Sequence, residues 1–134
     1  MCKERPLIAV VDDEESIRKA LSRLLRLSGL RVEAFPSGTE FLESLRNHTP
    51  DCVVLDLHMP EIDGFEVESQ LADAGFRLPI VAITGRDAPK DRERMTARGV
   101  AAFLQKPLDG QTLLTAIDAA TKPMSNGMSP NSDN

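Results

Sequence analysis

The stretch LIAVVDD, residues 7–13, is an uninterrupted apolar run that ends in two aspartates. An apolar run closed by a polar side chain occurs three more times, in Cys52 to Leu55 before Asp56, Pro79 to Ile83 before Thr84, and Val100 to Leu104 before Lys106. Runs of this length are typical of strands buried on both faces of a parallel sheet. The carboxyl ends of parallel strands lie at one edge, where open α/β sheets bind ligands. We therefore expect Asp12, Asp13, Asp56, Thr84 and Lys106 to gather at that edge.

Helical patterns alternate with these runs along the chain. Ile17, Leu21 and Leu25 recur at helical spacing, and Ser37 to Glu40 has the sequence of a capping box. This alternation is typical of βαβ units and predicts an α/β fold with a parallel sheet. The expected strands are 7–11, 31–35, 52–55, 79–83 and 100–104. The expected helices follow at about 14–28, 37–45, 65–74, 89–98 and 108–121.

The overall composition limits the classes of function. A chain of 134 residues with 41% hydrophobic and 28% charged residues is typical of one globular domain. The net charge of −5 argues against direct nucleic-acid binding by this chain. We find no stretch that could span a membrane, no signal peptide and no disulfide framework in Cys2 and Cys52, which favours the cytoplasm. We expect one domain over residues 6–121 and a disordered tail or linker over residues 122–134.

The three aspartates at the expected edge predict a cation site. Two like charges about 4 Å apart repel by roughly 4 kcal/mol at an effective dielectric constant of about 20, so the group must bind a proton or a cation. Mg²⁺ fits carboxylates that share it with water and phosphate oxygens, and Mn²⁺ is a second possibility. Simpler explanations exist for each residue, since Asp12 and Asp13 could cap a helix, Lys106 could be solvated and Thr84 could be a turn residue.

Crowded carboxylates beside a lysine also predict a reaction. Asp56 is the expected nucleophile, because a carboxylate can accept a phosphoryl group as an acyl phosphate. The metal and Lys106 would neutralise charge on the transferred group. The hydroxyl of Thr84 could then turn onto a phosphate oxygen, and Phe103 could fill the gap that this motion leaves.

At these residues the chain resembles bacterial response-regulator receiver domains. The motifs are VVDDE at 10–14, VLDLHMP at 54–60, Asp63-Gly64, ITG at 83–85 and FLQKP at 103–107. The resemblance runs from about Leu7 to Ala119 and is strongest to the FixJ-type subfamily. It implies a flavodoxin-like, doubly wound (βα)5 fold with strand order 2-1-3-4-5.

The resemblance also implies a role for each site residue. Asp56 would be the phosphoacceptor, and Asp13 and Asp56 would bind Mg²⁺ directly, with Asp12 acting through water. His58 would contribute only its backbone carbonyl, and its side chain is expected to be exposed on a loop.

The implied phosphoryl-binding residues are Thr84 and Lys106, with a cis bond before Pro107. Thr84 and Phe103 would be the switch pair. The implied partner is a sensor histidine kinase or phosphotransfer protein that docks near Ser16 and Ile17.

The resemblance implies an output face made of the fourth helix, fifth strand and fifth helix. Arg86 to Arg94 is dense in charge where FixJ-type receivers often carry apolar or small residues. A contact made there should be polar and salt-sensitive, and the chain should be a monomer or a phosphorylation-dependent dimer. His48 is expected to be an ordinary surface residue.

Several alternatives remain open from the sequence. The chain could be a stand-alone receiver acting on a downstream protein, or the receiver half of a FixJ/NarL-type DNA-binding regulator whose output domain is absent. We expect a signalling module and not an enzyme. A phosphatase of the haloacid dehalogenase kind would carry a second aspartate two residues after its nucleophile, where this chain has His58 after Asp56. A module that has lost phosphorylation would not need the acidic triad.

Overall fold

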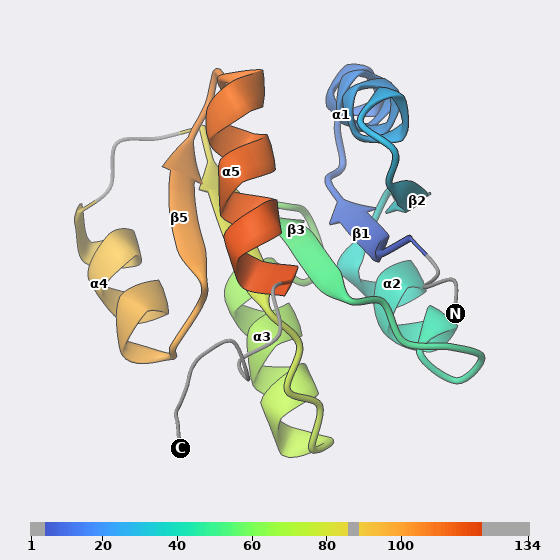
Figure 1. The fold of residues 1–134 in the computed structure, drawn as a ribbon. Helices are drawn as coiled ribbons and strands as arrows, with labels where there is room; N and C mark the ends of the chain where they lie inside the picture. The colour runs from blue at the N-terminus through green and yellow to red at the C-terminus, as the bar shows by residue number, and fades with distance from the viewer. Residues whose placement is uncertain (1–4, 86–88, 122–134) are drawn as a thin grey trace, which may run out of the picture.

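The computed structural model of the protein describes residues 5–85 and 89–121. Within them a parallel sheet has the strand order β2-β1-β3-β4-β5, which confirms the predicted doubly wound fold (Figure 1). The strands are β1 (Leu7–Val11), β2 (Arg31–Phe35), β3 (Cys52–Asp56), β4 (Ile80–Thr84) and β5 (Ala102–Gln105). The predicted tail at 122–134 lies outside the described residues, as does Cys2.

Helices connect successive strands and cover both faces of the sheet (Figure 1). They are α1 (Glu15–Leu27), α2 (Gly38–Ser44), α3 (Gly64–Asp73), α4 (Pro89–Ala97) and α5 (Gly110–Thr121). Ser37 caps α2 by accepting a hydrogen bond from the backbone N–H of Glu40, as its capping pattern predicts. In the described part of the chain, no helix is long and apolar enough to cross a bilayer.

Most predicted boundaries are within one residue of the observed ones, and two starts are wrong by two residues for local reasons. β5 begins at Ala102 and not at Val100, because the Val100 N–H bonds to Met95 and closes α4, with Gly99 at a φ of 82°. α5 begins at Gly110 and not at Leu108, because the Asp109 carboxylate accepts hydrogen bonds from Thr112 and so acts as the helix cap.

The core has one apolar layer on each face of the sheet. α1 and α5 cover one face with buried leucines and isoleucines, among them Leu21, Leu25, Leu113 and Ile117. α2 and α3 cover the other face through Phe41, Val67 and Leu71. The charged helix α4 contributes a single buried side chain, Met95, to a small third cluster. Cys52 is fully buried in β3, where burial raises the pKa of its thiol to about 12.

Candidate functional site

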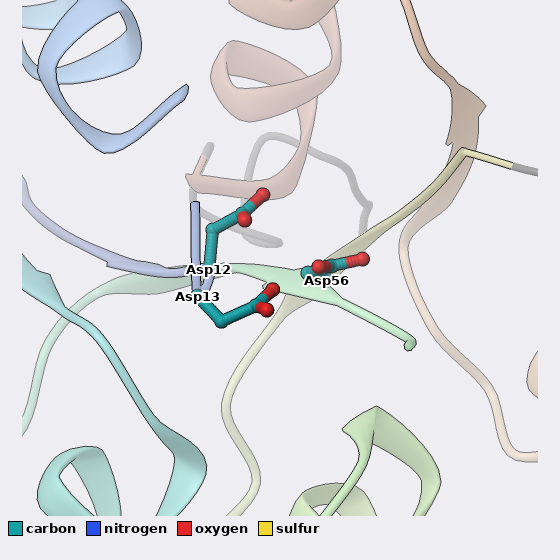
Figure 2. A group of neighbouring side chains, drawn as sticks. All are labelled: Asp12, Asp13 and Asp56. Carbon is teal, nitrogen blue, oxygen red and sulfur yellow. The ribbon is translucent and has the colours of Figure 1, made fainter. Parts of the chain in front are cut away.

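The three predicted carboxylates lie together at the carboxyl edge of the sheet (Figure 2). Asp12 and Asp13 follow β1, and Asp56 is the last residue of β3. β1 and β3 are paired neighbours with Val11 opposite Leu55, so the next residues, Asp12 and Asp56, come side by side. One oxygen from each of the three carboxylates lies within 4.8 Å of the others. The sheet topology therefore brings together acids that are more than 40 residues apart.

The burial of these acids is unequal. Asp12 is fully buried and Asp56 is 3% exposed, whereas Asp13 is exposed to solvent. Burial, together with the charge of Asp12, raises the pKa of Asp56 from 3.8 to about 6, although Lys106 and the His58 backbone N–H oppose the shift. The fold therefore holds a carboxylate whose negative charge is destabilised until a proton or a cation compensates for it.

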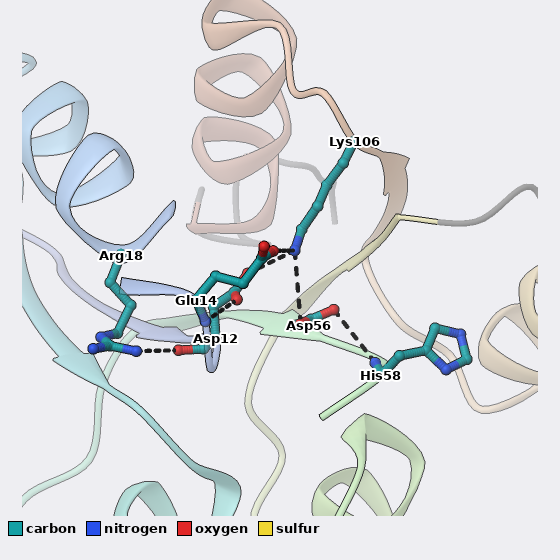
Figure 3. A network of polar contacts seen from close by, with 6 residues as sticks. All are labelled: Asp12, Glu14, Arg18, Asp56, His58 and Lys106. Atoms are coloured by element: carbon teal, nitrogen blue, oxygen red, sulfur yellow. Dashed lines mark hydrogen bonds and ion pairs between the residues drawn. The ribbon is translucent and has the colours of Figure 1, made fainter. Parts of the chain in front are cut away.

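Lys106 directly follows β5 and reaches this group across β4 (Figure 3). Its Nζ lies 3.0 Å from Asp12 Oδ2, 3.1 Å from Glu14 Oε1 and 3.7 Å from Asp56 Oδ2. Burial alone would lower the pKa of Lys106, but hydrogen bonds to Asp12 and Glu14 and the nearby charges outweigh it and raise that pKa. The ammonium group therefore stays charged beside the acids. The backbone holds it there, because the Lys106 N–H donates to the Thr84 carbonyl at 2.7 Å.

The acidic group fits a divalent cation. Asp12 Oδ2 is buried and, among the described residues, accepts no hydrogen bond of good geometry, having only the ion pair with Lys106. Asp12 Oδ1 accepts from the Glu14 N–H at 2.9 Å, which forms a turn before α1 and not a helix cap, because Glu14 is the N-cap residue and no side chain caps this helix. One lysine beside three clustered carboxylates leaves negative charge uncompensated. Oxygen ligands with excess negative charge are what Mg²⁺ or Mn²⁺ requires.

The predicted switch residues lie on the neighbouring strands β4 and β5. Thr84 ends β4 and is fully buried. Phe103 is half-buried on β5, directly opposite Ala82, which lies two residues before Thr84 on the same face of β4. The peptide bond between Lys106 and Pro107 is cis.

The His58 side chain differs from its expected free exposure. It is 34% exposed, and its Nε2 lies 2.9 Å from Asp91 Oδ2 on α4. The His58 backbone N–H donates to Asp56 Oδ1 at 3.3 Å (Figure 3). His48 is on the surface, as expected, and contacts Glu33 at 2.7 Å.

The structure adds three residues that the sequence analysis did not assign to the site. Glu14 shares Lys106 with the aspartates, and Arg18 donates to the Asp12 carbonyl at 2.8 Å. Gly64 packs so closely on β3 that an added Cβ would lie 2.7 Å from the Asp56 carbonyl oxygen. Glu14 could have been suspected from its place in the run Asp12-Asp13-Glu14. The sequence carries no comparable signal for Arg18.

The curated proteins that the chain is similar to include several response regulators. Response regulator MprA of Mycobacterium sp. (strain KMS) is 38% identical over 125 residues, covering 93% of this chain and 54% of that protein. Response regulator protein TodT of Pseudomonas putida is 37% identical over 123 residues, covering 91% of this chain and 54% of that protein. The chain thus spans about half the length of the curated relatives that it matches.

Solved structures agree with these relatives. The response regulator receiver protein from Burkholderia phymatum has a TM-score of 0.78 and 38% identity, covering 87% of this chain and 95% of that one. FixJ-N has a TM-score of 0.80 and 32% identity, covering 89% and 95% of the two chains. The family described as the response regulator receiver domain matches residues 8–118. The chain therefore belongs to the response regulator receiver domain family.

Proposed function

We propose that Asp56 is the phosphoacceptor of this receiver domain and that phosphorylation requires Mg²⁺ or Mn²⁺. The observation that carries the proposal is the contact of Lys106 with both Asp12 and Asp56, at the edge where three carboxylates meet. Such a site attracts a cation and a phosphoryl group together. A carboxylate at its centre is a suitable nucleophile for a phosphorylated donor.

The ion would be held by Asp13 and Asp56 directly, by Asp12 through water and by the His58 backbone carbonyl. When bound, it supplies positive charge that neutralises the carboxylates and the oxygens of the incoming phosphoryl group. The exposed position of Asp13 leaves this side of the site open to solvent and to a donor.

In the transfer step, an Asp56 carboxylate oxygen attacks the phosphorus of a phosphohistidine. The bond from phosphorus to the imidazole nitrogen breaks, and its electron pair stays on that nitrogen. Lys106 binds a phosphoryl oxygen, which weakens its ion pairs with Asp12 and Asp56. The buried Thr84 hydroxyl donates a hydrogen bond to another phosphoryl oxygen. Phe103 then moves toward the position that the Thr84 side chain leaves.

This switch would alter the surface formed by α4, β5 and α5, which we propose as the output face. The domain over 6–121 would act in the cytoplasm as a signalling module and not as an enzyme with turnover. Its partners would be a sensor histidine kinase or phosphotransfer protein, docking near Ser16 and Ile17, and a downstream protein. Among receivers, we propose that this chain belongs to the FixJ-type subfamily.

A second possibility is favoured by the lengths of the relatives. Because this chain spans about half of MprA and of TodT, it could be the receiver part of a longer regulator with a DNA-binding output domain. Residues 122–134 would then be a linker. In both cases the receiver chemistry at Asp56 would be the same.

The test is intact-mass spectrometry after incubation with acetyl phosphate and MgCl₂. The wild type should gain one phosphoryl group, and the gain should disappear in EDTA and in Asp56→Asn. Asp73→Asn, at the exposed carboxyl end of α3, is the matched control and should be phosphorylated normally. Phosphorylation of Asp56→Asn to the wild-type extent would refute the proposal, as would phosphorylation that is unaffected by EDTA.

A further inference from the structure

Helix α4 is attached to the domain by an unusual set of contacts. Met95 is its only buried side chain, and the helix is otherwise highly charged. Asp91, Arg92 and Arg94 each contact a different neighbour: His58 after β3, Phe103 on β5 and Phe65 at the start of α3. Contacts of charged side chains therefore attach α4 to the domain, where an apolar stripe attaches the other helices.

One of these contacts falls on the proposed switch residue. The guanidinium carbon of Arg92 lies 4.6 Å from the centre of the Phe103 ring. This is within the range of a cation–π interaction, which favours the ring in the place where the guanidinium covers it. Arg92 itself is exposed, and among the described residues its guanidinium makes no hydrogen bond or ion pair that would hold it away from this ring.

In the proposed switch, the Phe103 ring takes up a second position, closer to Thr84. Phe103 is paired with Ala82 on β4, whose side chain is only a methyl group, and Thr84 follows two residues later on the same face of the sheet. If Phe103 moves toward Thr84 when the domain is phosphorylated, the ring must leave the guanidinium of Arg92. The cation–π contact is then present in the resting state and lost in the activated one.

We infer that Arg92 is a positioning residue that biases the domain toward its resting state by holding the Phe103 ring against α4. This inference rests on the proposed function and adds a restraint supplied by α4 itself. A contact that favours only one of two states shifts their ratio by its own free energy. For an exposed cation–π pair, that corresponds to a shift of about two- to fivefold.

Arg94 provides a matched control on the same helix. Its guanidinium carbon lies 3.8 Å from the centre of the Phe65 ring, so it also stacks on an aromatic side chain and helps to attach α4. Phe65 is a buried residue of α3 and not part of the proposed switch pair. Loss of Arg94 should therefore loosen α4 without releasing Phe103.

The experiment measures binding of beryllofluoride with Mg²⁺, a mimic of the phosphoryl group, to four proteins. Arg92→Gln should bind about two to five times more tightly than the wild type, because less free energy is needed to leave the resting state. Arg92→Lys, which keeps a cation, should lie closer to the wild type. Arg94→Gln should bind as the wild type does. Urea unfolding of each variant reports any general loss of stability.

A second measurement follows the ring directly in the metal-free protein, with the beryllofluoride complex as its reference. In protein labelled with 4-fluorophenylalanine, the Phe103 ¹⁹F resonance is assigned with Phe103→Leu. In the absence of beryllofluoride, this resonance should shift in Arg92→Gln toward its position in the beryllofluoride complex. It should not shift in Arg94→Gln.

Three results would overturn the inference. The first is an equal beryllofluoride affinity of Arg92→Gln and the wild type, and the second is an equal change of that affinity in Arg92→Gln and Arg94→Gln. The third is a Phe103 resonance that does not shift in Arg92→Gln. These failures differ from failure of the proposed function. In that case the wild type itself would bind no beryllofluoride, or Asp56→Asn would bind it equally well, and both proposals would fall.

Discussion

Helices α4 and α5 lie beside the same strand, β5, but are held to the sheet by different forces (Figure 1). α5 buries Leu113 and Ile117 in the largest apolar cluster, with further small and apolar side chains packed around them. α4 buries Met95 alone and otherwise relies on contacts of charged side chains. The apolar attachment is strong and cannot be adjusted by a single charge, whereas the polar one can.

The faces of the sheet and its carboxyl edge also differ in being apolar and charged, respectively. The faces are apolar, and their burial stabilises the fold. The edge gathers buried carboxylates whose mutual repulsion opposes folding when no cation is bound. Substitutions in the two regions should therefore change stability in opposite directions.

The largest expected effect is in the apolar region. Ile117→Ala removes a fully buried side chain from α5 and should lower the free energy of unfolding by about 3 kcal/mol. Urea unfolding measures this loss, and Ile117→Val should cost only about 1 kcal/mol. A loss below 1 kcal/mol for the alanine variant would mean that α5 is no more firmly packed than α4.

Substitution of Asp56 should have the opposite sign. Because the pKa of Asp56 is raised to about 6 in the fold, its contribution to stability is present below pH 4 and is lost as the pH rises through 6. Asp56→Asn should therefore stabilise the protein at pH 7 without Mg²⁺, by about 2 kcal/mol, and should have no effect near pH 3.

Two controls sharpen this comparison. The exposed Asp13 should give a much smaller gain when it is changed to Asn. Mg²⁺ at millimolar concentration should stabilise the wild type and reduce its difference from Asp56→Asn, because the ion binds only the folded site. A destabilised Asp56→Asn at pH 7 without metal would contradict the account of a strained acidic edge.

The smallest effect is expected for the polar contacts of α4. Arg94→Gln should lower the free energy of unfolding by about 0.5–1 kcal/mol, since it removes one cation–π contact. The loss should grow when Met95 is also changed to Ala, because the two side chains attach the same short helix. A loss as large as that of Ile117→Ala would erase the difference between the two helices.

The sequence predicted those parts of the structure that depend on local patterns. Apolar runs located four of the five strands, and β1 and β2 have the predicted bounds. The motifs identified the receiver family, which the family match confirms. Once the strands are parallel, the position of Asp12, Asp56 and Lys106 at one edge follows from topology.

The contacts that depend on side-chain orientation could not be predicted in this way. α4 has no apolar stripe, so its sequence does not indicate which side faces the sheet. The pairs His58 with Asp91 and Glu14 with Lys106 join residues 33 and 92 positions apart through flexible side chains. The strand and helix ends at Ala102 and Gly110 depended on capping bonds that the apolar pattern does not reveal.

The most direct test of the whole account is hydrogen–deuterium exchange with and without beryllofluoride and Mg²⁺. We expect peptides from α4 to exchange faster than those from α5 in the resting protein, because few apolar contacts hold α4. On addition of beryllofluoride, exchange should change in α4 and β5 of the wild type but not of Asp56→Asn, while the buried face of α5 stays protected. Equal exchange in both helices, or a response that persists in Asp56→Asn, would contradict the account.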